Sequence, residues 1–495
     1  MNADVPALAY AFAKRQGVVV LSVDAGVVRV GLREDAAADA LLEARRVLGR
    51  SLAVERLSAD TFARRLADVY RGGDGAAEVE ALDGQGGLES LIDDIPPAAD
   101  LLETQDDAPV IRLINGLIAE GARLGASDIH LEPYDTALRV RFRVDGVMRE
   151  AATLPSRIAP LLVSRVKVMA RLDIAERRVP QDGRISLVMG ARALDVRVST
   201  LPARGGERVV LRLLDKERGA LTLAELGMPP AVRTAYETSL RVPHGIVLVT
   251  GPTGSGKTTS LYAGLSRLND GSRNILTVED PVEYAIDGIG QTQVNTKVGM
   301  SFAAGLRAIL RQDPDVVMVG EIRDAETAQI AVQASLTGHL VLSTVHTNDA
   351  VGAITRLRDM GIEPFLLAST VRLILAQRLV RRLCPHCREP DGAGVRPASL
   401  LGGGFDGRSW RATGCTECKH TGYIGRIGLY EAVTADEELR RLIGANADES
   451  ALADAAFARA PRLLDAAREA VQCGDTTLEE AFRVTRRDPH DDADV

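Results

Sequence analysis

Hydrophobic and polar positions along the first 222 residues follow two successive patterns. Residues 1–70 combine short apolar runs, such as Val18 to Val23, with leucine- and alanine-rich stretches at helical spacing. This mixture predicts a small α+β domain. Residues 108–222 begin with the helix-like segment PVIRLINGLIAEGARLG and continue with alternating segments such as LRVRFRVDGV and ALDVRVSTL. The change from helical to twofold periodicity predicts a second α+β domain.

From residue 223 the chain alternates apolar runs with helical stretches. The apolar runs are GIVLVT, ILTVED, VVMVGE and HLVLSTVH. Buried strands separated by helices predict an α/β domain with a doubly wound, mostly parallel sheet over residues 223–383, and a helical part follows over residues 421–486.

Two segments lack such periodicity. Residues 71–107 are acidic and rich in glycine and alanine, which predicts a flexible linker. Residues 487–495 contain four aspartates and predict a disordered tail. No apolar stretch is long enough to span a bilayer, and we therefore expect a cytoplasmic protein that reaches membranes through partners. The formal net charge of −8 argues against broad binding to nucleic acid.

A glycine-rich segment after GIVLVT carries the strongest chemical signal. It has the pattern of a P-loop between a strand and a helix, and it predicts an ATP and Mg²⁺ site. Backbone N–H groups of such a loop cradle phosphates, while Lys257 reaches the β- and γ-phosphates and Thr258 offers its hydroxyl to Mg²⁺. The expected nucleotide-binding residues are Gly251, Pro252, Thr253, Gly254, Ser255, Gly256, Lys257, Thr258 and Thr259.

Acidic residues follow two other predicted strands, where they can orient water or hold the Mg²⁺ shell. Glu321 ends one of these strands, with Asp324 three residues later. The other cluster follows ILTV and comprises Glu279, Asp280, Glu283 and Asp287. His339 and His346 flank the strand LVLSTV, and with a P-loop nearby such histidines can sense the γ-phosphate.

Four of the five cysteines form two CxxC pairs separated by 27 residues. We expect Cys384, Cys387, Cys415 and Cys418 to bind one tetrahedral Zn²⁺ in a module over residues 384–420. A redox pair is the alternative, and His386 and His420 are alternative ligands. Basic and acidic residues balance between these cysteines, which argues against nucleic-acid binding by the module. Cys473 is expected to be an apolar filler.

The segment LRQDPDVVMVGEIRD resembles the signature of the type II/IV secretion ATPase superfamily. ILTVEDPVEY resembles its aspartate box, and TGHLVLSTVHTNDA resembles its histidine box. ASDIHLEP, VPQDGRISL and the paired cysteines extend the resemblance over nearly the whole chain from residue 98. Within the superfamily the pattern is most similar to the type II secretion ATPases, and LAYAFAKRQGVVVL is similar to the opening domain of that subgroup.

The resemblance implies a RecA-like ATPase domain, a PAS-like second domain, and a homohexamer that hydrolyses ATP to drive pseudopilus assembly and protein export. It assigns the Walker B role to Glu321 and the aspartate-box role to Glu283, without deciding between them as the base. It also implies that Arg197 and Arg212 of the second domain close over the γ-phosphate, with Arg307 and Arg311 as further candidates for phosphate or subunit contacts.

The resemblance further implies two inner-membrane partners. Residues 1–70 would dock on a protein L-like partner, and the zinc module would help couple the motor to a protein F-like platform. Three alternatives remain open at this point: a type IV pilus assembly ATPase, a DNA-translocating ring ATPase, and a nucleotide-binding scaffold without turnover.

Overall fold

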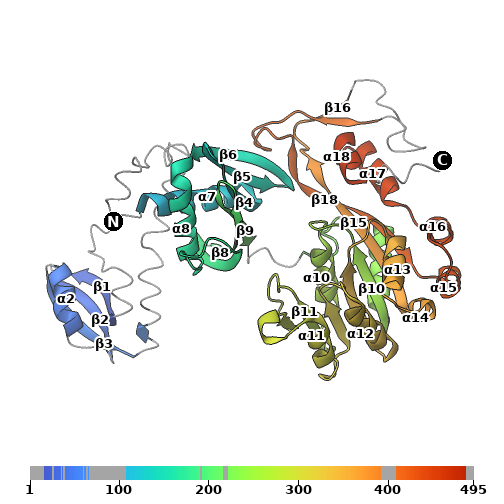
Figure 1. Cartoon of the computed structure of the whole chain (residues 1–495), viewed down its shortest axis with the longest axis horizontal. Helices are drawn as coiled ribbons and strands as arrows, with labels where there is room; N and C mark the ends of the chain where they lie inside the picture. Colours follow the sequence, from blue (N-terminus) through green and yellow to red (C-terminus); the bar gives the residue numbers. More distant parts are fainter. Residues whose placement is uncertain are drawn as a thin grey trace. The chain divides into compact units, whose positions relative to one another are not determined.

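The computed structural model forms two compact units, residues 1–217 and 218–495 (Figure 1). The residues that the structure describes are 16–24, 27–34, 36, 39–48, 50–58, 61–62, 65, 108–189, 192–215, 221–391 and 408–485. The linker predicted over residues 71–107 and the tail predicted over residues 487–495 lie outside these ranges.

The N-terminal part of the first unit is a three-stranded sheet with one helix. Its strands are β1 (Val18–Asp24), β2 (Val27–Arg33) and β3 (Ser51–Leu57), and its helix is α2 (Asp39–Leu48). β1 pairs with β2 antiparallel, whereas β3 lies parallel to β2 because α2 makes the crossover between them. Buried valines of β1 and β2 pack against Ala40, Ala44 and Leu48 of α2. The predicted small α+β fold is thereby confirmed for this part.

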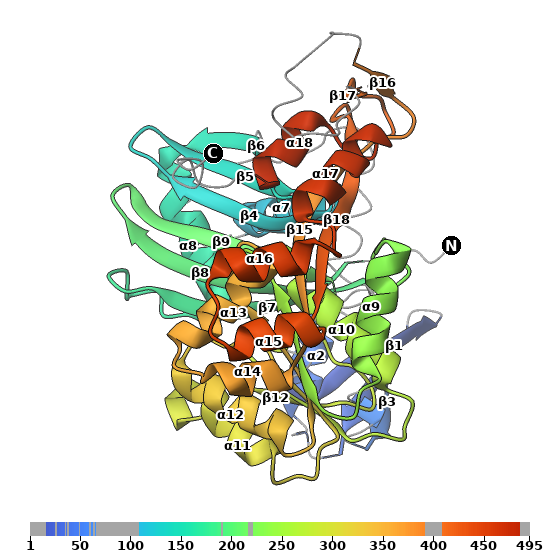
Figure 2. The same ribbon diagram turned by 90° about the vertical axis from the view of Figure 1, so that its right-hand side faces the viewer.

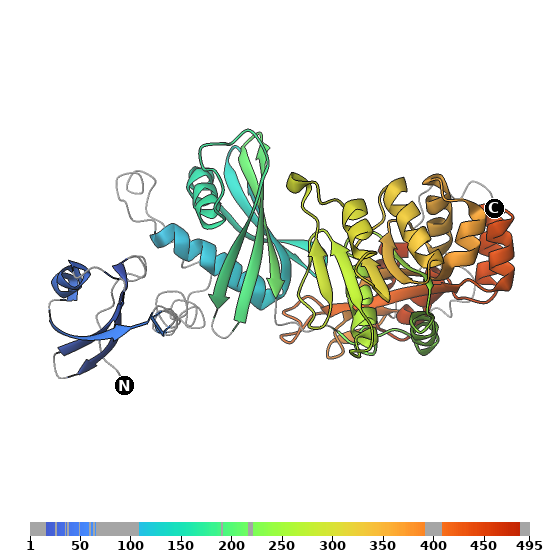
Figure 3. The same ribbon diagram turned by 90° about the horizontal axis from the view of Figure 1, so that it is seen from below.

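The rest of the first unit is a six-stranded antiparallel sheet in the order β6-β5-β4-β9-β8-β7. Its strands are β4 (Ala126–Pro133), β5 (Ala137–Val144), β6 (Val147–Pro155), β7 (Gln181–Met189), β8 (Arg192–Ala203) and β9 (Gly206–Asp215). Alternate residues of these strands pack their apolar side chains against α7 (Ala108–Leu124) and α8 (Ala159–Met169), and α8 begins after the short helix η2 (Ser156–Ile158). Both α7 and α8 lie on the same side of the sheet (Figure 3). The opposite face of the sheet carries mostly charged residues, including Asp128, Arg197 and Arg212.

The second unit is built on a seven-stranded sheet in the order β12-β11-β13-β14-β10-β15-β18, parallel except for β18. Its strands are β10 (Gly245–Thr250), β11 (Ile275–Glu279), β12 (Gly290–Gln293), β13 (Val316–Val319), β14 (Leu340–Val345), β15 (Val371–Leu383) and β18 (Tyr423–Thr434). The four strands predicted from the apolar runs are confirmed as β10, β11, β13 and β14. The central strand β10 is buried along its whole length, as both faces are covered by helices.

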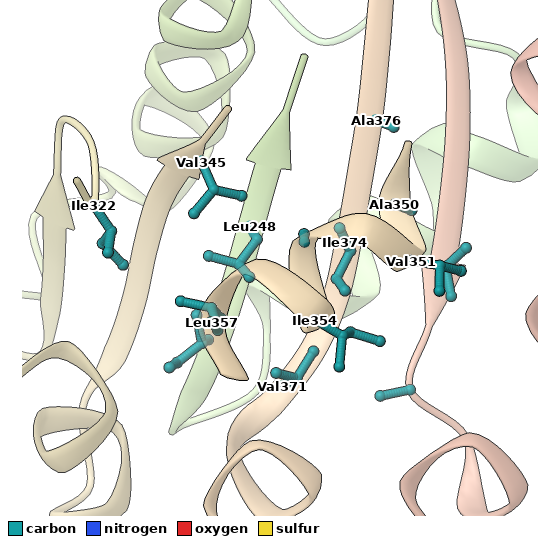
Figure 4. Packing of buried hydrophobic residues seen from close by; sticks show 14 of the residues in the cluster. Leu248, Ile322, Val345, Ala350, Val351, Ile354, Leu357, Val371, Ile374 and Ala376 are labelled. Atoms are coloured by element: carbon teal, nitrogen blue, oxygen red, sulfur yellow. The ribbon is translucent and has the colours of Figure 1, made fainter. Parts of the chain in front are cut away.

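Helices cover both faces of this sheet (Figure 2). α9 (Pro230–Leu240) and α10 (Lys257–Leu268) pack on the face that presents Val247 and Val249. The other face is covered by α11 (Phe302–Ile309), α12 (Ala325–Leu336), α13 (Ala350–Asp359) and α14 (Pro364–Thr370). Figure 4 shows α13 laying Val351, Ile354 and Leu357 against the strands. This doubly wound arrangement confirms the predicted fold of the unit.

The C-terminal part continues the same core. The helices α15 (Glu437–Gly444), α16 (Glu449–Phe457), α17 (Leu463–Gln472) and α18 (Leu478–Thr485) follow β18, and the short strands β16 (Arg388–Pro390) and β17 (Trp410–Ala412) form a hairpin-like pair between β15 and β18. Aspartates at the N-caps start several helices, among them Asp436 before α15 and Asp448 before α16. Within the described ranges no helix combines the length and apolarity needed to cross a membrane.

Candidate nucleotide site and metal centre

The P-loop connects the carboxyl end of β10 to the first turn of α10. Gly256 is the N-cap of α10 and has φ +86°, a left-handed conformation that glycine adopts without strain. A Cβ at Gly251 would lie 2.5 Å from the carbonyl oxygen of Gln377, so no larger residue fits there. The N–H groups of the first helical turn lack intrahelical acceptors and point toward the loop, which makes this end of α10 a site for phosphate oxygens.

Lys257 folds its side chain back over this loop. Its Nζ donates to the carbonyl oxygens of Gly251 (2.8 Å) and Pro252 (3.1 Å), and it lies 3.4 Å from Nδ1 of His346. Burial lowers the pKa of Lys257 to about 8, although the charge of Glu321 acts in the opposite direction. The two hydrogen bonds are to neutral carbonyl oxygens, and the negative charge of a bound polyphosphate would supply an anionic partner for the ammonium.

Gln377 of β15 supports the P-loop and the start of α10 through two side-chain hydrogen bonds. Its Nε2 donates to the carbonyl oxygen of Ser255 (2.6 Å), and its Oε1 accepts from the hydroxyl of Ser260 on α10 (2.7 Å). The side chain is almost fully buried, with 2% of its surface exposed. Sequence patterns did not indicate this residue, because Gln377 lies more than a hundred positions after the loop it supports.

Glu321 and His346 meet at the carboxyl ends of the neighbouring strands β13 and β14. His346 Nε2 lies 3.3 Å from Oε2 of Glu321, while Oε1 of Glu321 forms an ion pair with Arg323. This contact to Glu321 raises the pKa of Arg323 further. A chain of contacts thus runs from Lys257 through His346 to Glu321, and it brings three of the predicted site residues together.

His339 does not belong to this chain of contacts. It lies at the opposite end of β14, where its Nδ1 is 2.9 Å from the carbonyl oxygen of Ala334. Asp324 also has a structural role, because its carboxylate caps α12 by accepting a hydrogen bond from the backbone N–H of Thr327 at 2.8 Å. The sequence could not separate these structural roles from catalytic ones.

The acidic cluster after β11 divides into buried and exposed members. Glu279 is 2% exposed and accepts hydrogen bonds from Tyr262, Thr277 and Gln291, so its carboxylate belongs to the interior. Asp280, Glu283 and Asp287 lie on the following loop with exposed side chains. The exposed residues on the loop therefore stay the candidates in this cluster for contact with a nucleotide.

Arg197 and Arg212 occupy directly opposite positions on β8 and β9, and Arg184 lies opposite Arg197 on β7. We call Arg184, Arg197 and Arg212 the arginine row. Directly opposite residues share one face of a sheet, and this face is the one that α7 and α8 leave uncovered. Arg212 donates through Nε to Oδ1 of Asp128 (2.8 Å), and its side chain remains 59% exposed.

Asp128 anchors Arg212 on the sheet surface. Burial alone would raise the pKa of Asp128, but hydrogen bonds from Arg212 and Ser127 bring it below its usual value. Asp128 therefore stays ionised at neutral pH and orients the Arg212 guanidinium, whose remaining N–H groups can donate to an anion.

Arg307 and Arg311 lie at the end of α11 in the second unit. Arg307 forms an ion pair with Glu326, and Nη1 of Arg311 donates to the carbonyl oxygen of Arg307 at 2.9 Å. The Arg307 guanidinium thereby contacts α12, and the side chains of both arginines are exposed. A role for them in phosphate or subunit contacts stays a prediction.

The four predicted cysteine ligands come together between β15 and β18. Three Sγ–Sγ distances are 3.8 Å, and all four sulfur atoms lie within 4.8 Å of one another. Zn–S bonds of about 2.3 Å in a tetrahedron place the sulfurs about 3.8 Å apart, so the spacing fits Zn²⁺. The cysteines form no disulfide, and all four sulfurs of the two CxxC pairs converge on one point, an arrangement that fits a single metal ion. Neither His386 nor His420 belongs to the group.

Backbone N–H groups prepare one of these sulfurs for a metal. The N–H groups of Cys415 and Gly422 each donate to Sγ of Cys418 at 3.1 Å. Burial raises the pKa of the Cys418 thiol, but the two backbone donors together with the side chains of Cys415 and Cys387 lower the pKa to about 6. Cys473 is exposed, so the expectation that it fills an apolar core is wrong.

Purified full-length chain is expected to contain one zinc ion, measured by elemental analysis. Cys418→Ser should lose the metal, because a hydroxyl replaces a thiolate ligand in a site that has only four. Cys473→Ser is the matched control and should keep the full zinc content. Equal zinc in the two variants would refute the site.

Nucleotide binding near pH 8 is expected to take up about half a proton per site, because Lys257 is then about half neutral and bound phosphates favour its charged form. The uptake should fall toward zero as the pH decreases below the pKa. Calorimetry with ADP in buffers of different ionisation enthalpy measures this quantity. Lys257→Arg, whose charge is permanent, should bind without this uptake, and an unchanged uptake would assign it to another group.

Comparisons with known proteins cover both units. Residues 103–483 match the family described as Type II/IV secretion system protein, and residues 7–70 match a domain family described under GSPII protein E. Type II secretion system protein E of Pseudomonas aeruginosa is 56% identical over 487 residues, which cover 97% of this chain and 96% of that protein. Type II secretion system ATPase E of Vibrio cholerae is 54% identical over 459 residues, which cover 90% of each chain.

Two solved structures share the fold of the larger part of the chain. The pilus retraction motor PilT with bound ADP is 28% identical, with a TM-score of 0.52, over 76% of this chain and 97% of that chain. The ATPase DotB of Legionella pneumophila has a TM-score of 0.56 at 22% identity, over 75% of this chain and 94% of that chain. The DotB likeness supports the RecA-like fold.

Proposed function

This chain belongs to the type II/IV secretion system protein family, and from this membership we propose how its residues drive secretion by hydrolysing ATP. The chain is an ATP hydrolase and the motor of a type II secretion system, since relatives of that description match it over nearly its full length. The observation that carries the proposed site is the P-loop of β10 and α10 with Glu321 and His346 at the same edge of the sheet.

ATP binds with its phosphates in the P-loop. Lys257 exchanges the carbonyl oxygens of Gly251 and Pro252 for phosphate oxygens, and the N–H groups of the first turn of α10 donate to them. The hydroxyl of Thr258 and the carboxylate of Glu321 are oxygen donors of the kind that Mg²⁺ prefers, so these residues fit the ion. When bound, the ion would neutralise part of the phosphate charge.

Glu283 acts as the base that takes a proton from the attacking water. Its exposed position on the loop after β11 supports this role, and Glu321 is assigned to the Mg²⁺ site. Phosphate release from ATP by the full-length chain tests the proposal. The Glu283→Gln chain should bind ATP and fail to turn it over.

Arg197 and Arg212 complete the site when the domain of residues 108–222 closes over the γ-phosphate. Arginine suits this task because its charge is permanent and its planar donors match phosphate oxygens. A site that needs a moving domain converts each hydrolysis event into a displacement. We expect the motor to work as a homohexamer, and the ring gives each displacement a neighbouring subunit to act on.

The chain acts at the cytoplasmic face of the inner membrane through partners. The domain formed by residues 1–70 docks on a protein L-like inner-membrane partner, and the match of residues 7–70 to a GSPII protein E domain family supports this assignment. The tetracysteine module holds Zn²⁺ as a structural ion and couples the motor to a protein F-like platform. The module projects from two long paired strands, β15 and β18, which can transmit movement of the core.

A further inference from the structure

A buried polar cluster lies beside the loop that carries Glu283. Its members are Tyr262 of α10, Thr277 and Glu279 of β11, and Gln291 of β12. Tyr262 and Thr277 are fully buried, Glu279 is 2% exposed, and Gln291 is half-buried. We call these four residues the tyrosine cluster. Burying a polar group costs free energy unless the group is hydrogen-bonded, and the members of this cluster are hydrogen-bonded to one another.

Hydrogen bonds inside the cluster occupy both carboxylate oxygens of Glu279. The Tyr262 hydroxyl donates to Oε2, while Oε1 accepts from Thr277 Oγ1 (2.5 Å) and from Gln291 Nε2 (3.2 Å). Glu279 is thereby fixed as an acceptor within the interior. Its carboxylate accepts hydrogen bonds from both Tyr262 and Gln291, which constrains the positions of these two side chains.

Tyr262 and Gln291 form hydrogen bonds with the backbone of the loop at three residues. Tyr262 Oη accepts the backbone N–H of Glu283 (3.3 Å). Gln291 donates to the carbonyl oxygen of Tyr284 (3.1 Å) and accepts the N–H of Ile286 (2.8 Å). The rings of Tyr262 and Tyr284 also meet edge to face at 4.7 Å. These contacts fix the loop backbone from Glu283 onward.

Tyr262 belongs to the same helix as the P-loop residues. α10 begins at Lys257, so Tyr262 lies one helical turn after Thr258. A helix is rigid over this distance. Tyr262, which contacts the Glu283 backbone, therefore moves together with the phosphate-binding residues Lys257 and Thr258 as one rigid unit.

We propose that Tyr262 is a positioning residue for hydrolysis, which sets Glu283 relative to the P-loop. The proposal rests on the proposed role of Glu283 as the base. A displacement of about 1 Å in a catalytic group can reduce a rate by up to about a hundredfold, so an anchor of this kind affects turnover more than binding.

Tyr262→Phe in the full-length chain tests the proposal, because it removes the hydroxyl and keeps the ring. We expect kcat to fall about tenfold or more, with the Kd for ATP within about twofold of its original value. Tyr236→Phe is the matched control. The Tyr236 hydroxyl is also buried and donates to α10, but it does so at the carbonyl oxygen of Ser260 (3.0 Å) and not at the Glu283 loop.

Both substitutions should lower the melting temperature, and only Tyr262→Phe should lower kcat. Equal kcat in the two variants would overturn the proposal. Gln291→Met provides a second route if Tyr262→Phe fails to fold, since it releases the loop from the β12 side and should also lower kcat with little effect on Kd. Normal kcat in Gln291→Met would count against the cluster as an anchor.

A double variant separates this inference from the role of Glu283. Tyr262→Phe added to Glu283→Gln should cause no further loss of kcat, because the anchor acts through the carboxylate that is already gone. Two independent losses would show that Tyr262 acts elsewhere and would overturn the proposal. Full turnover by Glu283→Gln alone would instead refute the assigned base.

Discussion

Replacing Arg212 with alanine is expected to reduce ATP turnover by about three to five orders of magnitude while ATP still binds. Asp128 orients this guanidinium on the face of the sheet that α7 and α8 leave uncovered, and the remaining N–H groups of Arg212 can donate to an anion. The same result is expected for Arg197→Ala, because Arg197 is assigned with Arg212 to the γ-phosphate and lies directly opposite it on β8. Steady-state phosphate release and equilibrium binding of a fluorescent ATP analogue measure the two quantities.

Arg184→Ala is the matched control for both variants. Arg184 belongs to the same arginine row, one strand further along on β7, and it is not assigned to the phosphate. Its turnover should stay near the original value. Normal turnover in Arg212→Ala would refute the closing role, and an equal loss in Arg184→Ala would point to the charge of the whole face instead of particular residues.

Replacing Glu283 with glutamine is expected to lower kcat by about two to four orders of magnitude, because the amide cannot accept a proton from water. The loop backbone keeps its anchors on Tyr262 and Gln291, so ATP and Mg²⁺ should still bind. Rapid-quench measurements of a single turnover separate the chemical step from product release.

Glu321→Gln serves as the comparison for this variant. Glu321 contacts Arg323 and His346, and we assign it to the Mg²⁺ site. Its main effect should therefore be a higher Mg²⁺ concentration for half-maximal turnover. The reverse pattern, with Mg²⁺ dependence altered by Glu283→Gln and the chemical step lost in Glu321→Gln, would exchange the two roles.

The P-loop and its flanking elements could be predicted because their signal is local. GIVLVT, the glycines and the start of α10 are contiguous, and each segment has the composition that its conformation requires. The cysteine ligands are also local in pairs, so their spacing predicted the module. The N-terminal segment indicated the type II subgroup for the same reason, and the match of residues 7–70 confirms that choice over the pilus assembly alternative.

Long-range contacts could not be predicted from these patterns. The strand β15 was not predicted, since Gln377 and Arg378 interrupt its apolar run with polar side chains. Their partners explain their burial. Gln377 supports the P-loop, and Arg378 donates to the carbonyl oxygen of Asn348 at 2.6 Å. The P-loop lies more than a hundred positions before Gln377, and Asn348 lies 30 positions before Arg378. No local sequence pattern could therefore predict these contacts.

The acidic cluster shows a second limit of sequence patterns. Glu279 and Glu283 have the same side chain four positions apart, and both were candidates for orienting water. β11 ends at Glu279, which leaves that carboxylate within the core, whereas Glu283 lies beyond the strand on the surface. The end of the strand and the contacts of Tyr262 and Gln291 with Glu279 separate the two carboxylates, and neither can be read from the sequence.

The central claim is that this chain binds ATP at the P-loop and hydrolyses it with Glu283. The most direct test is phosphate release at saturating ATP and Mg²⁺ by the full-length chain, measured beside Glu283→Gln with bound nucleotide determined in both. We predict equal ATP binding, continuous phosphate release by the original chain, and a rate about two to four orders of magnitude lower in the variant. Equal rates of phosphate release by the two chains would contradict the claim.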